Sequence, residues 1–186
     1  VLHSHASEVF AAMGYVAAWR MQRNDRGLVT LPLAWIYGLS SASLALLTSG
    51  ATVVLMTHFN PEQALEAIER ERVTAFFGSM SMYVKMLDVL LQRDFDLSSL
   101  RLCINGAEPC PEASVRAFEE RAGVKLTQAY ALSEARPVIA EDPLDKLAPA
   151  GTCGQLVPGA AVRLLDDEGD EGKVGEAGEA FVRCPG

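Results

Sequence analysis

Residues 73–134 have the sequence VTAFFGSMSMYVKMLDVLLQRDFDLSSLRLCINGAEPCPEASVRAFEERAGVKLTQAYALSE, and this stretch decides the fold. Short runs rich in Val, Ile, Leu and Phe alternate there with segments whose apolar residues recur at helical spacing. In chain order, the predicted strands and helices are Val73–Phe77, Met80–Leu91, Leu100–Ile104, Pro111–Arg121 and Val124–Ala129. Strands joined by single helices form a parallel sheet with helices on its faces. The stretch therefore predicts an α/β fold with a mostly parallel sheet and flanking helices.

The same alternation continues toward the N-terminus. A first helix, capped by Ser4 or Ser7, is indicated by the helical spacing of Val9, Phe10, Met13, Val16 and Ala17. A strand, a short helix and a buried strand follow at Leu28–Leu31, Leu44–Leu47 and Ala51–Met56. The run Asn60-Pro61-Glu62 places a cap, a Pro and an acid in succession, which predicts a helix start.

The pattern changes at Gly151, where Gly-rich β-hairpins replace the β-α alternation. Two strands, Ala161–Leu165 and Glu179–Arg183, flank an acidic turn. We therefore expect residues 1–150 to form an α/β part and residues 151–186 a C-terminal β-hairpin segment of the same domain.

Composition excludes some classes of function. The 186 residues carry a formal net charge of −8, which argues against nucleic-acid binding. Residues 166–176 hold six acids against one Lys, so the rest is close to neutral. No charged residue occurs from Gly27 through Pro61, but Pro and Gly interrupt this stretch, so we expect no integral membrane segment. The four cysteines form no CxxC pair, which favours reduced thiols in a cytoplasmic protein.

Loops that follow the strands of a parallel sheet gather at its carboxyl edge, where ligands bind. Three such loops are Gly78–Ser81, Asn105–Pro109 and Tyr130–Glu134. Gly106 and Ala107 would let a flat ligand approach the backbone. Ser133 and Glu134 offer oxygens that suit Mg²⁺ beside a nucleotide phosphate. A plain turn remains an alternative for the Asn105–Pro109 loop, and a helix cap for Ser133 and Glu134. His3-x-His5 has no further His or Cys nearby, which favours a solvent or capping role over a metal site.

Together these stretches resemble the AMP-forming adenylate synthetases, a family of acyl-CoA synthetases, aryl-CoA ligases, luciferases and peptide-synthetase adenylation domains. Residues 1–5 resemble the segment after the family's phosphate loop, and residues 32–39 its P-L-F-H-x-Y-G-L acyl-pocket motif. Asn105–Pro109 resembles the G-A-x-P adenine loop, and Gln128–Glu134 resembles Q-G-Y-G-x-T-E. Residues 151–159 and 175–186 resemble the family's C-terminal hairpins.

The resemblance implies that a carboxylic acid of the fatty or a similar apolar class is activated by ATP as acyl-AMP and passed to CoA. Glu134 would bind Mg²⁺, and Ser133 would contact the phosphate as its catalytic partner. The implied nucleotide-binding residues are Gly106, Ala107, Glu108, Pro109, Gln128, Tyr130 and Ser133. The implied acyl-pocket residues are Trp35, Tyr37, Ser41 and Ala131.

Some positions depart from the family pattern. Ala129 and Ala131 stand where the family commonly has Gly, which narrows the site, and Trp35 stands where His is frequent. Trp35 either gates the pocket or is ordinary core packing. The pocket candidates Trp35, Ile36, Tyr37 and Met80 include no basic group for a second substrate charge. An adenylation domain that loads a carrier protein, and a non-catalytic nucleotide- or protein-binding α/β module, remain as alternatives.

We expect this chain to be a central piece of a longer protein, without the phosphate loop, the ribose-binding Asp or the C-terminal domain with its catalytic Lys. The isolated 186-residue chain should therefore form no acyl-AMP from ATP and any acid, as measured by chromatography of the products. Uncovered apolar surface should also make it self-associate. Acyl-AMP formation would contradict the first expectation, and a monomer by light scattering at high concentration would contradict the second.

Overall fold

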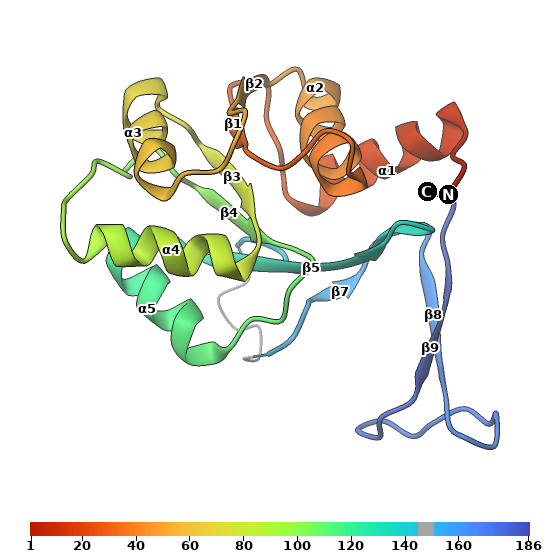
Figure 1. Cartoon of the computed structure of the whole chain (residues 1–186). Coiled ribbons are helices and arrows are strands. Elements are labelled where there is room, and N and C mark those ends of the chain that lie inside the picture. The colour runs from red at the N-terminus through yellow and green to blue at the C-terminus, as the bar shows by residue number, and fades with distance from the viewer. Residues whose placement is uncertain (145–150) are drawn as a thin grey trace.

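A computed structural model describes residues 1–144 and 151–186 and has a seven-stranded sheet at its centre (Figure 1). The strand order is β2-β1-β3-β4-β5-β6-β7, and the first five strands in that order run parallel. The strands are β1 Arg26–Val29, β2 Thr52–Leu55, β3 Ala75–Gly78, β4 Leu102–Asn105, β5 Leu126–Leu132, β6 Ala135–Ala140 and β7 Gln155–Leu156. The predicted α/β class with a mostly parallel sheet is confirmed.

Helices cover both faces of this sheet, and a separate apolar core lies under each layer (Figure 1). The first layer contains α1 His5–Ala18, the π-helix η1 Tyr37–Leu44 and α2 Ala45–Ser49. The second layer contains α3 Pro61–Glu71, α4 Met80–Leu90 and α5 Glu112–Ala122. Along β3 the side chains alternate between the two cores, so that Phe76 packs under the second layer and Phe77 under the first. No helix within the described ranges has the length and apolar character needed to cross a membrane.

Helix α1 begins where the sequence predicts but buries a different face. Ser4 is its N-cap, and the Ser4 and Ser7 side chains form a capping box. The buried side chains are Ala11, Ala12 and Tyr15, whereas Val9 and Met13 are 57% and 59% exposed. The predicted helix is confirmed, but Val9 and Met13 lie away from the core, because the helix packs Ala11, Ala12 and Tyr15 toward the sheet.

The strand predicted as buried at Ala51–Met56 is an edge strand. Strand β2 pairs only with β1, and Leu55 is 61% exposed. The short helix expected at Leu44–Leu47 is part of a longer helical segment, because η1 starts at Tyr37 and α2 continues to Ser49. The C-cap Gly50 has φ +77°, a conformation that L-side chains disfavour, and it ends this segment.

Strand β5 is longer than expected and turns back on itself. We expected a loop from Tyr130 to Glu134, but β5 continues to Leu132, and only Ser133 and Glu134 form a turn before the antiparallel strand β6. Tyr130 pairs with Ile139 of β6, so the ladder between the strands keeps this segment extended. The element is a hairpin and not a loop or a helix start.

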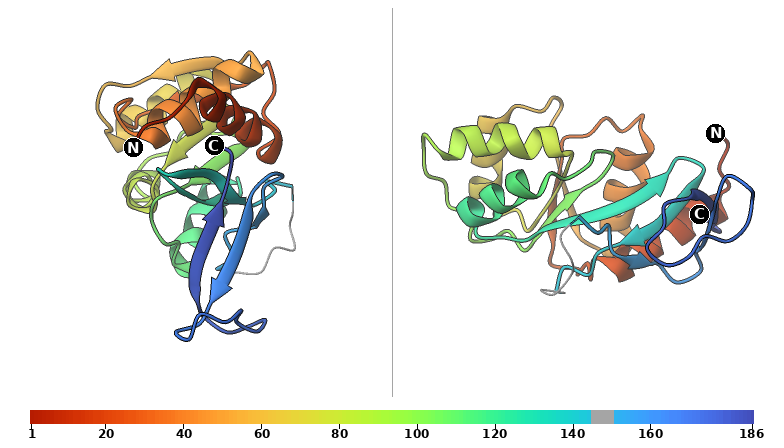
Figure 2. Two further views of the ribbon diagram at one scale, coloured as in Figure 1. Left: turned by 90° about the vertical axis from the view of Figure 1, so that its right-hand side faces the viewer. Right: turned by 90° about the horizontal axis from the view of Figure 1, so that it is seen from below.

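The last two strands leave the sheet and form a hairpin, β8 Ala161–Leu165 and β9 Glu179–Arg183, with the bounds that the sequence predicts. Figure 2 shows this hairpin extending away from the rest of the molecule. The boundary expected between residues 150 and 151 adjoins residues 145–150, which lie outside the described residues. All four cysteines are free thiols.

A buried aspartate joins three strands at the amino edge of the sheet. Asp25 precedes β1, is 2% exposed and accepts a hydrogen bond of 2.7 Å from the Thr74 hydroxyl before β3. It also pairs with Arg101, before β4, and accepts the Gln22 N–H at 2.7 Å. Burial by itself raises the pKa of Asp25, but the hydrogen bonds from Arg101, Thr74 and Gln22 outweigh this, so the pKa lies below its ordinary value.

Asp25→Asn should destabilise the chain by about 2–4 kcal/mol, because the amide cannot accept from all three donors and leaves the Arg101 charge without its partner. Arg101 is one-third exposed and retains some hydration, which keeps the loss at the lower end. The measurement is urea unfolding at neutral pH, with Asp167→Asn in the exposed hairpin turn as the control. Equal stability of Asp25→Asn and this control would contradict the assignment.

The same pair predicts a pH dependence. The pKa of Asp25 is lowered in the folded state. Its contribution to the free energy of unfolding is therefore present above the unfolded pKa of about 3.9 and is lost as the pH falls through the folded pKa. The stability difference between the unmodified chain and Asp25→Asn should therefore narrow below about pH 4.

Candidate functional site

A cavity of about 500 Å³ lies at the carboxyl ends of β4 and β5, beneath α1 and η1. Three of its lining residues, Tyr15, Trp19 and Ile104, are no more than 2% exposed. Trp35, another lining residue, is 64% exposed. The other lining residues are Val1, His3, Ala34, Ile36, Tyr37, Ser41, Gly106, Ala107, Ala129, Ala131, Leu132, Ser133 and Arg136.

The structure divides the residues that the sequence singles out into two groups. Those that line this cavity are Trp35, Tyr37, Ser41, Gly106, Ala107, Ala131 and Ser133. Those that do not line it are Glu108, Pro109, Gln128, Tyr130 and Glu134. Met80, offered as a pocket candidate, packs 5% exposed in the core on the other face of the sheet, so that assignment is wrong.

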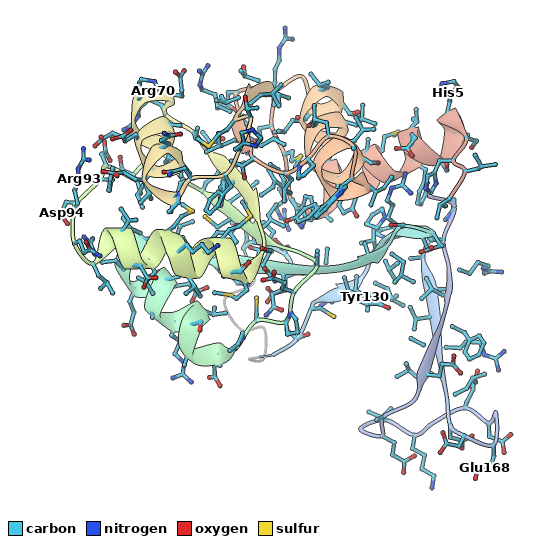
Figure 3. The ribbon with its side chains drawn as sticks, viewed as in Figure 1. His5, Arg70, Arg93, Asp94, Tyr130 and Glu168 are labelled. Carbon is cyan, nitrogen blue, oxygen red and sulfur yellow. The ribbon has the colours of Figure 1, made fainter. Side chains whose placement is uncertain are left out.

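Between Ala129 and Ala131 the alternation of β5 decides which side chains reach the cavity, and Leu132 lines the cavity as well, after a register shift between Tyr130 and Leu132. Ala129 and Ala131 face the cavity, and the side chain between them, Tyr130, points to the opposite face of the strand. Figure 3 labels Tyr130 on the side of β5 away from α1, where it is 37% exposed. The parallel register Asn105↔Gln128 brings the end of β4 level with this part of β5. The site is therefore built on two sides of one strand end.

Tyr37 supports the cavity wall and is not available as a polar contact. Its hydroxyl lies 3.1 Å from the carbonyl oxygen of Gly78 and 3.0 Å from that of Ile104, at the ends of β3 and β4. Its ring lies against Gly106, where an added Cβ would come within 3.1 Å of ring carbons. Burial raises the pKa of Tyr37 well above its ordinary value, so the hydroxyl remains protonated.

The Asn105–Pro109 loop is held in place by two side chains. The Asn105 amide donates to the Glu108 carbonyl oxygen at 2.8 Å. The Glu108 carboxylate accepts the Ser81 N–H at 2.7 Å and the Ser81 hydroxyl at 3.0 Å, which caps the first turn of α4. Ala107 has φ +69°, a left-handed conformation that costs a non-glycine residue about 1 kcal/mol. The cap by Glu108 and the Asn105 bond stabilise this strained turn.

Arg136 is a site residue that the sequence analysis missed. Its side chain is fully buried, lines the cavity and forms an ion pair with Glu8 of α1. Its guanidinium also donates to the Ser40 hydroxyl at 3.2 Å and to the Ser133 carbonyl oxygen at 3.2 Å. Arg136 therefore connects α1, η1 and the β5–β6 turn. The sequence analysis found no basic group among its pocket candidates because Arg136 was not one of those candidates. The available signal was a single cation in the apolar strand Ala135–Ala140.

The partners of Arg136 explain two further features. Burial alone raises the pKa of Glu8, but hydrogen bonds from Ser40 and Arg136 outweigh it and lower the pKa, so Glu8 stays ionised opposite the guanidinium. The His3 ring nitrogens lie 3.2 and 3.3 Å from the Arg136 Nη1. His3 thus lines the cavity, and the expected solvent or capping role is wrong for it, whereas His5 begins helix α1 and lies at its outer end (Figure 3).

The described side chains form no cluster of three metal-binding groups. Glu134 contributes a single carboxylate in the β5–β6 turn, next to Ser133 at the cavity. Mg²⁺ commonly takes one or two protein carboxylates and completes its shell with water and substrate phosphates. This donor set fits a magnesium ion that arrives with a nucleotide, and it does not fit a metal held by the protein alone.

The comparisons with known proteins agree on one family. The family model described as AMP-binding enzyme matches residues 1–186. An indoleacetate–CoA ligase from Aromatoleum aromaticum is 34% identical over 99% of this chain and 36% of its own length. A feruloyl-CoA synthase from Amycolatopsis sp is 31% identical over 98% of this chain and 37% of its own. This chain thus spans about a third of the length of these curated relatives.

Solved structures give the same result. The amide bond synthetase McbA from Marinactinospora thermotolerans matches with a TM-score of 0.84 and 33% identity, over 98% of this chain and 37% of its own. The anthranilate CoA ligase AuaEII, in complex with anthranoyl-AMP, matches with a TM-score of 0.88 and 26% identity, over 98% of this chain and 36% of its own. From the family match over all its residues, the chain belongs to the AMP-binding enzyme family.

Proposed function

We propose that this chain is the central part of the large N-terminal domain of an AMP-forming acid–CoA ligase. The observation that carries the proposal is the division of the site by β5, with an apolar cavity on one side and the Tyr130 and Asn105–Pro109 segments beside it. An acyl group and an adenylate are the two halves of acyl-AMP, so the acyl group would occupy the cavity and the adenylate would adjoin it where Gly106, Ala107 and Ser133 line the cavity. The CoA ligases among the relatives support the same reaction.

The proposed reaction has two steps. A carboxylate oxygen of the acid attacks the α-phosphorus of ATP, and the bond to pyrophosphate breaks with its electron pair on the leaving oxygen. The thiolate sulfur of CoA then attacks the acyl carbon, and AMP leaves. Both steps depend on holding the reacting groups in line, and this positioning is the main contribution we assign to the chain.

The assigned residues divide this work. The acid would lie in the cavity against Tyr37, Ser41, Ala131 and Trp35, and the adenine beside residues 106–109, Gln128 and Tyr130. Ser133 would hold a phosphate oxygen, and Glu134 would hold Mg²⁺, which supplies positive charge against the phosphates when it is bound. Fixing this turn is the proposed task of Arg136, through the Ser133 carbonyl oxygen.

We further propose an apolar acid, of the fatty or a similar class, as the substrate and the cytoplasm as the compartment. CoA is the proposed acceptor, in preference to a carrier protein, because the curated relatives are CoA ligases. Four free thiols support a reducing compartment.

Glu134→Ala in the full-length protein should lower the rate of acid-dependent pyrophosphate release by about a hundredfold or more, because the magnesium ligand is lost. The fold should remain intact. The readout is a coupled pyrophosphate assay, with circular dichroism to check the fold. Glu120→Ala, an exposed carboxylate on α5, serves as the matched control and should keep full activity. Activity of Glu134→Ala at the level of this control would refute the metal assignment.

Glu108→Ala should raise the KM for ATP about tenfold with little change in the KM for the acid, because the adenine loop loses its bond to Ser81. Glu108→Gln keeps an acceptor oxygen and should restore most of the affinity. A direct contact between the Glu108 carboxylate and the nucleotide predicts equal losses for both variants, which steady-state kinetics would reveal.

A further inference from the structure

The most buried part of the cavity lining includes two aromatic side chains. The Tyr15 and Trp19 rings stack with centroids 4.5 Å apart, and Phe77 lies behind Trp19 at 5.9 Å. Trp19 is 1% exposed and belongs to the core beneath α1. A group bound in the cavity would therefore lie against these buried rings.

The other walls of the cavity are formed by a flat ring and by small residues. The Tyr37 ring lies on one side and the backbone of Gly106 and Ala107 beside it. Ala129 and Ala131 form the side contributed by β5. Aromatic groups pack favourably against such rings, both by area and by their preferred offset or edge contacts. This shape suits a planar group better than a flexible chain, because a chain must also lose conformational freedom to fit.

The charge in the wall is already balanced. Arg136 is paired with Glu8 and also donates to Ser40 and Ser133, so its charge is engaged within the protein. A second anionic group on the substrate would compete with Glu8 for the same guanidinium and would be buried beside its carboxylate. The body of the substrate is therefore uncharged.

From these observations we infer that the substrate is an aromatic carboxylic acid whose uncharged ring fills the cavity up to Tyr15 and Trp19. The inference rests on the proposed function and narrows its fatty or similar apolar acid to a compact, ring-bearing one. Relatives that are named for indoleacetate and ferulate are consistent with this narrowing. The stacked Tyr15 and Trp19 rings and the small alanine wall, however, are observed in this chain itself.

Ala131 is the residue at which the width of the cavity can be changed. Its methyl group faces the cavity from β5, and Ala131→Val adds two methyl groups at that wall. The narrower cavity should exclude a ring while it still admits a short alkyl chain. Ala180, an exposed residue of β9 in the hairpin, offers the same substitution away from the site.

The experiment measures pyrophosphate release by the full-length protein with indoleacetate, cinnamate, hexanoate and hexadecanoate. The inference expects kcat/KM for a ring acid to exceed that for hexadecanoate by about tenfold or more. It also expects Ala131→Val to lower kcat/KM for the ring acids by about tenfold or more and to change that for hexanoate by about threefold at most. Ala180→Val should leave every value unchanged.

Two results would overturn the inference and leave the proposed function intact. One is a kcat/KM for hexadecanoate equal to that for the ring acids. The other is an equal loss of kcat/KM for all acids in Ala131→Val. Absence of pyrophosphate release with every acid would overturn the proposed function itself, and the inference with it.

Discussion

The carbonyl oxygen of Ile104 is held from both faces of the sheet. The Tyr37 hydroxyl approaches it from η1 at 3.0 Å, and the Tyr83 hydroxyl approaches from α4 at 2.9 Å. The same two hydroxyls reach Gly78 and Phe76 of β3, so both helical layers are tied to the carboxyl ends of two adjacent strands. A buried carbonyl that lost these donors would carry a desolvation penalty. The rigid edge that results is the base on which the Asn105–Pro109 loop and the cavity are built.

Two ionic networks act at opposite ends of this sheet. Asp25 binds the amino ends of β1, β3 and β4, and Arg136 binds the turn after β5 to α1 and η1. Both are largely desolvated, and each charge has a partner together with neutral hydrogen bonds, which is the condition under which burial of a charge is tolerated. Each network spans segments far apart in sequence, so it fixes tertiary arrangement more than local conformation.

The sequence carries the fold class because the alternation of strands and helices is a local pattern. It also fixes the hairpin strands Ala161–Leu165 and Glu179–Arg183, whose apolar runs lie between Gly-rich turns. The sequence does not predict features that depend on contacts between distant segments of the chain. Leu55 is apolar and exposed because β2 is the edge strand among the described residues, and Val9 is exposed because α1 presents Ala11 and Tyr15 to the sheet. Arg136 and His3 enter the site through contacts more than a hundred residues apart, which no local pattern contains.

The alternation of β5 has one more consequence. Because neighbouring side chains of a strand point to opposite faces, deletion of Ala129 would turn each following side chain of β5 to the other face. The bulky Tyr130 would then stand where a small alanine forms the cavity wall, and an alanine would take the place of the aromatic ring on the other face. Such a deletion would therefore alter the cavity wall and the opposite face together, whereas a substitution alters only one of them.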